Sequence, residues 1–401
     1  MKIAIVGLLH HPIAEPFAGG MESHTWWLAK KLIEKGHEVT LFASGDSDPD
    51  LGLSPCIARS LKVHLKARTW EGRQACNMNA YASVIKKVCK GDFDIVHNNA
   101  LHPLLLLSAA DLPVPMLMVL HTPVYKELAA AIQYANARNE SGNLGVVAVS
   151  NSLAKEWSPL ISANVVYNGI DVDSWPWTAK AKSDCVLWYG RLVPEKAPHL
   201  AIQAALQAGY SINIAGPIGN QDYFEENVLP LMSSDRVHYL GHLSQAAIQR
   251  ALSQASVFVN TPVWDEPYGI VYAEALASGT PIATFNRGAA EEIVTECCGV
   301  VVKENTVEAL AKGIAIAARK SRADCRKRAV SFCNIDSMIA GYERLYIKLI
   351  AKQKQLARKR QQAEKVLAKR PKTTLQNAEI VANQIVAPGV PSADPRRKIA
   401  S

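Results

Sequence analysis

The sequence predicts an α/β protein with two Rossmann-like domains that face each other across a cleft, followed by a C-terminal helix and a basic tail. Its 401 residues suffice for two domains of ordinary size. Short apolar, β-branched runs alternate twice with helical segments, as they do in parallel sheets covered by helices. With 49% hydrophobic and 20% charged residues, the composition is that of a packed protein rather than a disordered one.

The first alternating series lies in residues 1–167, which we predict to form the first Rossmann-like domain. Its clearest helix covers residues 21–35 and stops at Gly36. Its strands are expected at residues 2–7, 38–42, 95–97, 116–120 and 146–149, with a last short strand near Val165.

The second series occupies residues 181–335 and predicts a second Rossmann-like domain. A turn-forming cluster, Asn168-Gly169-Ile170-Asp171, opens a hinge that we place at residues 168–180. Ligands bind at the carboxyl ends of strands in open α/β sheets, so we expect the active cleft between the two domains. The strands are expected at residues 185–190, 212–215, 237–240, 257–260, 281–284 and 300–302, with a helix at 198–208.

The C-terminal region carries the net positive charge. Apolar side chains at helical spacing predict a helix with a basic extension over residues 336–370, and the proline-containing residues 371–401 predict a disordered tail. Residues 351–401 contain 12 Lys/Arg and 3 Asp/Glu, whereas the rest of the chain contains 32 and 33. The folded part has no excess of cations for phosphates, which argues against nucleic acid as a partner.

Cysteine spacing and hydropathy indicate a cytoplasmic protein. The 8 cysteines contain no C-x-x-C pair, which favours reduced thiols over a disulfide framework or a zinc site. The apolar run at 103–120 is broken by Asp111 and three prolines, and residues 1–9 are too short for a secretory signal. We therefore expect a cytoplasmic location, in which the basic tail can attach the protein to the inner, anionic face of a membrane.

Residues 264–279 are the segment richest in potential chemistry. A helix is expected to begin near Gly269 and stop at Gly279, which places Glu266 in the preceding loop and Glu274 a little over one turn inside the helix. The first amides of such a helix lack intrahelical partners and suit a diphosphate. Isolated glutamates are more often solvated, but the flanking glycines and strands favour a binding role here.

This segment resembles the glutamate–seven residues–glutamate motif of the family 4 glycosyltransferases, which have the two-domain GT-B fold. The resemblance covers most of residues 1–350, and the order of the motifs along the chain gives it weight. One motif departs from the family pattern, because alanine stands where proline is usual in Gly288-Ala289-Ala290-Glu291-Glu292-Ile293. The other motifs are Gly19-Gly20-Met21-Glu22, His121-Thr122-Pro123, Val149-Ser150-Asn151-Ser152, Asn168-Gly169-Ile170-Asp171, Gly190-Arg191-Leu192-Val193-Pro194-Glu195-Lys196 and Leu240-Gly241.

The resemblance implies a retaining glycosyltransferase that moves a hexose from a nucleoside-diphosphate sugar to an acceptor hydroxyl. It assigns Arg191 and Lys196 to the donor diphosphate and Glu274 to the ribose. UDP is the expected nucleotide, because UDP-sugars are the commonest donors in the family, and guanosine and adenosine stay open. Glucose is the expected sugar among glucose, N-acetylglucosamine, galactose and mannose. The resemblance also places residues 1–167 on the acceptor side and residues 181–335 on the donor side. The other implied donor-binding residues are Gly20, Leu240, Gly241, Tyr268, Gly269, Ile270 and Val271.

His121 and Glu266 are the catalytic residues that the resemblance implies, both beside the transferred sugar. A histidine at a strand end is more often structural, but His121 can bind a hydroxyl or support developing charge. No cofactor and no metal are expected, since two cations and a helix N-terminus can neutralise the leaving diphosphate. The segment Asp46-Ser47-Asp48 has the spacing of a metal-binding motif, but its Gly/Ser/Pro-rich context indicates a turn.

Two other classes of function stay open, and the acceptor has no motif of its own. The alternatives are a phosphorylase or epimerase of the same fold and a non-enzymatic binding protein tethered by its basic tail. A requirement for inorganic phosphate would reveal the phosphorylase. His10 and His11, in the first loop, are candidates for the acceptor side. The pair Trp26-Trp27 fits either a core position or an acceptor platform.

Overall fold

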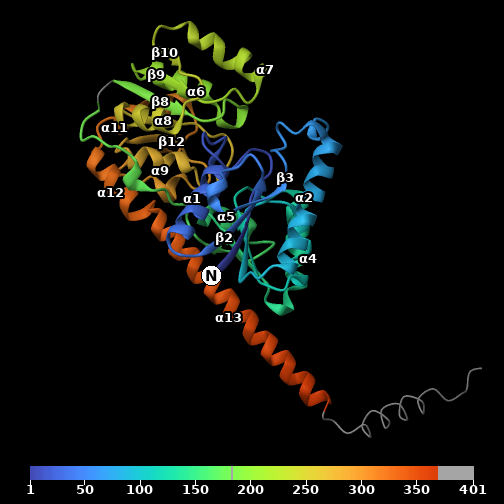
Figure 1. The fold of residues 1–401 in the computed structure, drawn as a ribbon. Coiled ribbons are helices and arrows are strands. Elements are labelled where there is room, and N and C mark those ends of the chain that lie inside the picture. The colour runs from blue at the N-terminus through green and yellow to red at the C-terminus, as the bar shows by residue number, and fades with distance from the viewer. Residues whose placement is uncertain (182–183, 369–401) are drawn as a thin grey trace, which may run out of the picture. The chain divides into compact units, whose positions relative to one another are not determined.

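The computed structural model describes residues 1–181 and 184–368. The chain divides into two compact units, residues 1–353 and residues 354–401. The first unit contains two parallel sheets, each covered by helices (Figure 1). The prediction of a disordered tail at residues 371–401 lies outside the described residues.

The first sheet has seven strands in the order β3-β2-β1-β4-β5-β6-β7. Six of them agree with the predicted strands, and β3 was not predicted. Pro55 interrupts the apolar pattern of β3, and a proline is tolerated there because β3 is an edge strand. The bounds are β1 (Lys2–Val6), β2 (Glu38–Ser44), β3 (Leu53–Ile57), β4 (Ile95–Asn98), β5 (Met116–Leu120), β6 (Leu144–Ala148) and β7 (Asn164–Val165).

Five helices accompany the first sheet. Side-chain caps begin three of them. Thr69 Oγ1 accepts from the amide of Gly72 at 3.0 Å, His102 Nδ1 from that of Leu104 at 3.3 Å, and Ser150 Oγ from that of Leu153 at 3.1 Å. Gly19, the residue before α1, provides no side-chain cap, so the first amides of α1 are open to a ligand. The bounds are α1 (Gly20–Glu34), α2 (Trp70–Lys90), α3 (Pro103–Leu107), α4 (Lys126–Ala137) and α5 (Asn151–Trp157).

The second sheet has six strands in the order β10-β9-β8-β11-β12-β13. In both sheets the first strand of the domain is internal and later strands add on either side, so the strand order reverses beside β1 and beside β8. The strands are β8 (Cys185–Tyr189), β9 (Ser211–Ala215), β10 (Val237–Tyr239), β11 (Phe258–Asn260), β12 (Ile282–Phe285) and β13 (Gly299–Val302). The helices are α6 (Pro198–Gln207), α7 (Gln221–Tyr223), α8 (Gln245–Gln254), α9 (Ile270–Ala277), α10 (Ala290–Ile293), α11 (Val307–Ala317) and α12 (Arg322–Phe332).

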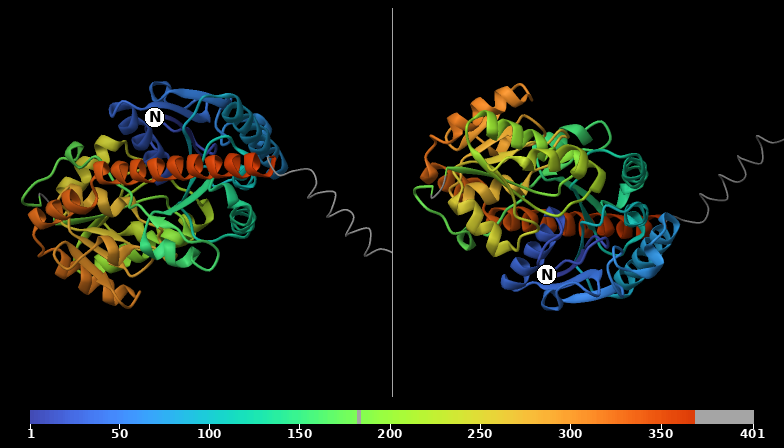
Figure 2. Two further views of the ribbon diagram at one scale, coloured as in Figure 1. Left: turned by 90° about the horizontal axis from the view of Figure 1, so that it is seen from below. Right: turned by 90° about the horizontal axis from the view of Figure 1, so that it is seen from above.

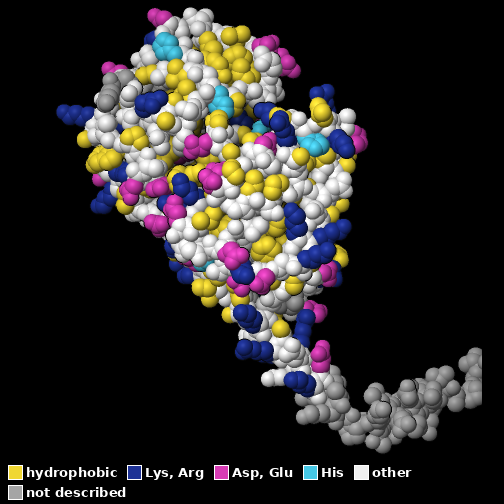
Figure 3. All heavy atoms as spheres, in the orientation of Figure 1, with side chains coloured by type: hydrophobic (Ala, Val, Ile, Leu, Met, Phe, Trp, Pro, Cys, Tyr) yellow, Lys and Arg dark blue, Asp and Glu magenta, His cyan; other side chains and the backbone are white. Residues whose placement is uncertain are grey.

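Helix α13 (Ile335–Ala368) begins at the hinge and returns to the first domain (Figure 2). The amide of Ile335 donates to the carbonyl of Ile170 at 2.9 Å, which fixes the start of the helix. Further along the helix, Leu349 packs closely on Gly145, and a Cβ on Gly145 would lie 2.7 Å from the leucine side chain. From residue 354 on, the described part of α13 is largely exposed and carries many of the Lys and Arg side chains visible in Figure 3.

Two features of the described residues bear on the predictions about thiols and membranes. All eight cysteines lie within this part, and each is a free thiol. None of its helices is both long enough and apolar enough to cross a bilayer.

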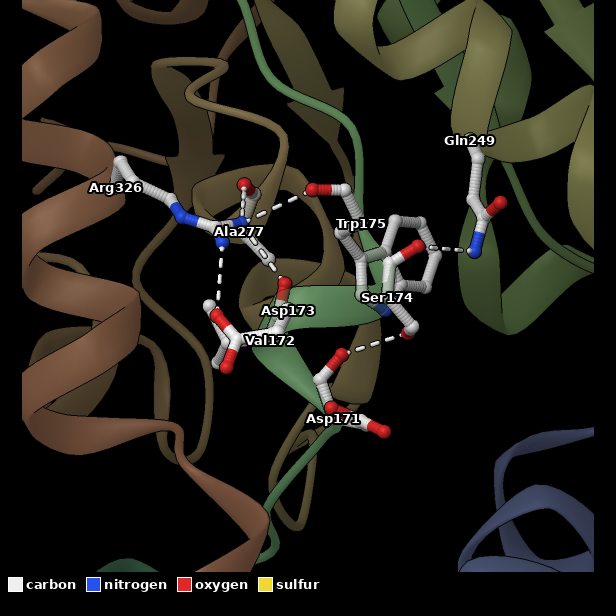
Figure 4. Close-up of polar contacts among 8 residues, drawn as sticks. All are labelled: Asp171, Val172, Asp173, Ser174, Trp175, Gln249, Ala277 and Arg326. Atoms are coloured by element: carbon white, nitrogen blue, oxygen red, sulfur yellow. Dashed lines mark hydrogen bonds and ion pairs between the residues drawn. The ribbon is translucent and has the colours of Figure 1, made fainter.

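Arg326 on α12 fixes the predicted hinge to the second domain (Figure 4). Its Nη1 donates to the carbonyl oxygens of Val172 at 2.8 Å and Trp175 at 3.1 Å. The same nitrogen lies 2.6 Å from the carbonyl of Ala277, the last residue of α9, and so satisfies one of the free carbonyls at that helix end. Its Nη2 also lies 3.4 Å from the carboxylate of Asp173, whose side chain is 97% exposed.

The buried contacts of Arg326 should contribute far more stability than its exposed ion pair. Arg326→Gln leaves several carbonyls without a donor, and we expect the free energy of unfolding to fall by about 2–4 kcal/mol. Asp173→Ala removes only the exposed partner and should change stability by less than about 0.5 kcal/mol. Chemical denaturation of the two variants checks this, and equal losses would contradict the assignment.

Candidate functional site

A cavity of about 480 Å³ lies between the two domains, at the carboxyl ends of their strands. Loops that follow β1 and β5 line it from the first domain, and loops that follow β8 and β11 line it from the second. Both points at which the strand order reverses therefore open into one cavity, where ligands bind in folds of this kind. The predicted site residues that line it are Gly20, His121, Arg191, Lys196, Glu266, Tyr268, Gly269, Ile270, Val271 and Glu274.

Leu240 and Gly241 are the two predicted donor-binding residues that do not line this cavity. The chain turns at Gly241, whose φ is +72° and whose carbonyl accepts from the amide of Gly216 at 2.8 Å. Leu240 is 40% exposed. The residues that follow the turn, His242 and Leu243, line the cavity in their place.

The N-terminus of α9 opens into the cavity from the second domain, as the sequence predicted. Gly269 precedes the helix with φ +78°, and a Cβ there would lie 2.5 Å from the ring of Tyr272. A glycine is therefore required to start the helix at this point. The amides of Ile270 and Val271 belong to the first turn of α9, so they have no acceptor within the helix and carry its positive dipole end.

Two hydrogen bonds fix the loop before α9. The carbonyl of Glu266 accepts from the amide of Ala289 at 3.0 Å. Gly288 permits this approach, because a Cβ there would lie 2.1 Å from the same carbonyl oxygen. The carbonyl of Pro267 accepts from Ser150 Oγ of the first domain at 2.6 Å. The start of α9 is thus held by both domains.

Glu266 and Lys196 form an ion pair at the cavity wall. Trp264 Nε1 donates to the same carboxylate at 3.2 Å, and the Lys196 ammonium lies 5.1 Å from the centre of the Trp264 ring. The side chains of Lys196 and Glu266 are 19% and 11% exposed, so both remain accessible from the cavity. The pair offers a cation for a phosphate and a carboxylate for sugar hydroxyls at adjacent points.

Glu274 lies one turn deeper in α9 and is buried, with 8% exposure. Tyr189, at the end of β8, donates a hydrogen bond from its hydroxyl to Glu274 Oε2. Burial raises the pKa of Glu274 to about 7, and the hydrogen bond from Tyr189 opposes this effect. A ligand that donates hydroxyl hydrogens would stabilise the ionised form, which matches the role predicted for this residue towards a ribose.

The first domain brings a second helix N-terminus to the cavity. Gly20 begins α1, and a Cβ at this position would lie 3.3 Å from the side chain of Ile270 on α9, so the two helix starts face each other closely. Arg191, in the loop after β8, also lines the cavity and makes no hydrogen bond or ion pair with any residue that the structure describes. Burial raises the pKa of Glu22, in the first turn of α1, while the charge of Arg191 acts to lower it.

His121 follows β5 and forms part of the cavity wall. Its Nε2 lies 3.0 Å from Oδ1 of Asn99, which follows the neighbouring strand β4. Burial holds the pKa of His121 well below its usual range, so the imidazole is neutral at physiological pH.

The carboxylates of the Asp46-Ser47-Asp48 segment have partners within the first domain. Asp46 accepts from the amide of Ser60 at 2.9 Å, and Asp48 accepts from Trp26 Nε1 at 2.7 Å. Trp26 is half-buried and packs edge-on to Phe17, with ring centres 5.7 Å apart. Over residues 1–181 and 184–368, no group of three His, Cys, Asp or Glu side chains is arranged to hold a metal ion.

Asn99 and Tyr189 were missed by sequence reasoning, and the contacts of Glu292, which lies in one of the motifs named above, were not predicted. Asn99 could have been found, because it follows the strand beside the reversal of strand order in the first sheet. Tyr189 had no signal apart from its place at a strand end. Glu292 accepts from the amides of Asn151 at 2.9 Å and Ser152 at 2.7 Å, and so joins the second domain to the first across 140 residues of sequence.

Two family models match the chain in succession. The model described as "Glycosyltransferase Family 4" matches residues 18–174, and "Glycosyl transferases group 1" matches residues 170–332. Together they span well over half of the chain and both domains. The chain belongs to the family 4 glycosyltransferases.

Relatives and solved structures agree with this family. The glycosyltransferase is 25% identical over 397 residues to a glycogen synthase of Mycobacterium tuberculosis (strain ATCC 25618 / H37Rv), covering 86% of this chain and 94% of the relative. It is 26% identical over 404 residues to a D-inositol 3-phosphate glycosyltransferase of Mycobacterium avium (strain 104), with the same coverage of 86% and 94%. Anabaena HepE in complex with UDP and glucose superposes with a TM-score of 0.67 at 18% identity, over 87% of this chain and 100% of that one. The predicted GT-B fold is confirmed.

The raised pKa of Glu274 makes the stability of this glycosyltransferase depend on pH. Because the folded value is about 7 and the ordinary value is 4.5, the folded state binds more protons between them, and stability falls as pH rises. Glu274→Gln removes the titrating group. Between pH 5 and pH 8 the free energy of unfolding should therefore fall by about 2 kcal/mol less in the variant than in the wild type.

Denaturant unfolding at several pH values measures the effect of Glu274→Gln. Glu127→Gln, an exposed change on α4, serves as the control and should leave the pH dependence as it is. If Glu274→Gln shows the same pH dependence as the wild type, the carboxylate is not held in the buried state described here.

Proposed function

We propose that this glycosyltransferase transfers a hexose from a nucleoside-diphosphate sugar to an acceptor hydroxyl with retention of configuration. The observation that carries the proposal is the convergence of the α9 N-terminus, Arg191 and Lys196 in one cavity whose wall also contains the carboxylates of Glu266 and Glu274. Anions bind at helix N-termini, and fixed cations stabilise the charge that develops on a departing diphosphate. Retention is inferred from the family.

Each side chain has a role in this proposal. Arg191 and Lys196 bind the diphosphate, and Glu274 binds the ribose hydroxyls. Glu266 and His121 act beside the transferred sugar. Lys196 pairs with Glu266 in the free protein. When a donor binds, its phosphate would replace Glu266 as the partner of the Lys196 ammonium.

UDP-glucose is the donor that we propose, without a metal cofactor. HepE, which shares the fold, was crystallised with UDP and glucose, and this supports the choice. The helix dipole of α9 and the cations Arg191 and Lys196 provide the positive charge that a metal supplies to diphosphates in other transferases.

Donor binding tests the site. Arg191→Ala removes a cation with no protein partner, so it should leave the fold stable and weaken UDP binding about tenfold or more. At saturating UDP this loss appears as about 1.4 kcal/mol less stabilisation in a thermal-shift titration. Glu274→Ala should also weaken binding, through the ribose.

Arg319→Ala, an exposed change in the turn that follows α11, is the matched control and should bind UDP as the wild type does. Release of UDP from UDP-glucose in the absence of inorganic phosphate distinguishes transfer from phosphorolysis. Proton NMR of the product's anomeric centre tests retention. Unchanged UDP affinity and turnover in both Arg191→Ala and Glu274→Ala would contradict the site assignment.

The acceptor side of the cavity is positively charged. The amide of Lys62 donates to the carbonyl of His10 at 3.1 Å, which fixes this lysine beside the first loop. Burial lowers the pKa of His10, and the charges of Arg73, Lys62 and Arg191 lower it further. These three cations form no ion pair with any described residue. On the face shown in Figure 3, Lys, Arg and His side chains gather beside the hollow between the domains.

We propose that the acceptor carries a negative group that Lys62 and Arg73 recognise. The printed name of the M. avium relative, a D-inositol 3-phosphate glycosyltransferase, supports an acceptor of this class. A phosphate would supply the anion that these two side chains lack. The exposed, basic part of α13 is in turn proposed to bind an anionic membrane surface.

Paired acceptors test this proposal. With UDP-glucose as donor, D-inositol 3-phosphate should stimulate UDP release more than myo-inositol does, and Lys62→Ala with Arg73→Ala should reduce that preference about tenfold. Lys86→Ala, an exposed change on α2 like Arg73→Ala, controls for surface charge. Equal use of the two polyols, or stimulation by neither, would contradict the proposal.

A further inference from the structure

Three buried histidines of the first domain lie together beneath the cavity. They are His24 on α1, His97 on β4 and His121 after β5, with exposures of 1%, 0% and 7%. The ring centres of His24 and His121 are 4.8 Å apart. Of the three, His121 alone is part of the cavity wall. The hydrogen bonds made by the residues packed around His121 determine which of its two ring nitrogens carries the proton.

The orientation of the Asn99 amide follows from Thr25. Thr25 Oγ1 donates its hydrogen to the carbonyl of Met21 at 2.9 Å, so towards Asn99 it can only accept. Asn99 Nδ2 lies 3.1 Å from this hydroxyl and is the donor. The carbonyl oxygen of the Asn99 amide therefore points away from Thr25, towards the histidines.

Asn99 Oδ1 lies 3.0 Å from Nε2 of His97 and 3.0 Å from Nε2 of His121. An amide oxygen only accepts, so both Nε2 atoms carry hydrogen. Burial lowers the pKa of His97 to about 3 and that of His121 well below its usual range, so both rings are neutral. Their Nδ1 atoms are consequently unprotonated.

Tyr346 of the C-terminal helix completes the arrangement. Its hydroxyl lies 2.6 Å from His97 Nδ1, which accepts its hydrogen. Tyr346 therefore stabilises the Nε2-protonated tautomer of His97, and His97 together with Thr25 keeps the Asn99 oxygen in the orientation that holds His121. Tyr342, one turn earlier, stacks on Tyr346 with ring centres 6.4 Å apart, but its own hydroxyl is buried without a partner.

The free nitrogen of His121 faces the cavity. Its Nδ1 has no partner in the described protein and, unlike both ring nitrogens of His24, it is not fully enclosed. In this neutral imidazole Nδ1 has a lone pair, so Nδ1 can accept a hydrogen bond but cannot donate one.

We propose that Tyr346, His97 and Asn99 form a relay that holds His121 in its neutral, Nε2-protonated form, with Nδ1 free to accept a hydrogen bond from a hydroxyl of the donor sugar. The contact with the sugar rests on the proposed function, whereas the tautomer rests on the relay alone. His121 is then the catalytic residue, and the other three are positioning residues. The C-terminal helix takes part in the active site through Tyr346, although it does not reach the cavity itself.

Nitrogen NMR of the full chain, labelled with ¹⁵N-histidine, tests the tautomer directly. In the wild type His121 should show a protonated Nε2 and an unprotonated Nδ1, with or without UDP. Tyr346→Phe removes the donor to His97 and should shift the signals of His97 and His121 towards a mixture of tautomers. Tyr342→Phe, which removes a hydroxyl without a partner from the same helix, should leave them unchanged.

Turnover of UDP-glucose gives the second readout. Tyr346→Phe should lower kcat roughly tenfold with little change in KM, since it alters the orientation of His121 and not the diphosphate site. Tyr342→Phe should retain wild-type kcat. An Nδ1-protonated or cationic His121 in the wild type, or equal losses in the two variants, would overturn the relay. If UDP fails to bind while the tautomer is as stated, the proposed function fails and the relay stands.

Discussion

The site depends on one short stretch of backbone, residues 266–269, whose path is fixed before any ligand arrives. Ala289 and Ser150 donate to its carbonyls from different domains, and Gly288 permits the approach of Ala289 to Glu266. This constraint directs the first amides of α9 into the cavity, while Arg326 holds the opposite end of the helix. A preorganised dipole stabilises developing charge without having to reorganise during the reaction.

Most of the fold could be predicted because its signal is local. Buried parallel strands are short apolar runs, and glycines end the helices between them, so two Rossmann-like series could be recognised without knowledge of their contacts. Strand β3 escaped because Pro55 and its polar neighbours lack that signal, and only its place at the sheet edge makes the proline acceptable. The hydrogen bonds from Arg326 to the hinge join segments about 150 residues apart, so no local sequence pattern predicts them.

The residues of the candidate site likewise fall into those that local sequence predicts and those that only the folded structure shows. Glu266, Gly269 and Glu274 could be placed from a strand, a loop and a helix start, since spacing along one helix determines their relative positions. The partners of these residues could not, because Tyr189 and Lys196 come from other strand ends. The relay from Tyr346 to His121 was the least predictable part of the site. Tyr346 and His97 are separated by 249 residues, and in its own segment each looks like an ordinary buried aromatic residue. Such contacts exist only after the chain has folded.

The most direct measurement is a crystal structure of the full chain with UDP bound. The account predicts that the diphosphate lies against the amides of Ile270 and Val271, with Arg191 and Lys196 on its oxygens and the ribose hydroxyls on Glu274. The ammonium of Lys196 should have left Glu266 for the phosphate. Diphosphate density elsewhere in the molecule, or at this position with Glu274 remote from the ribose, would contradict it.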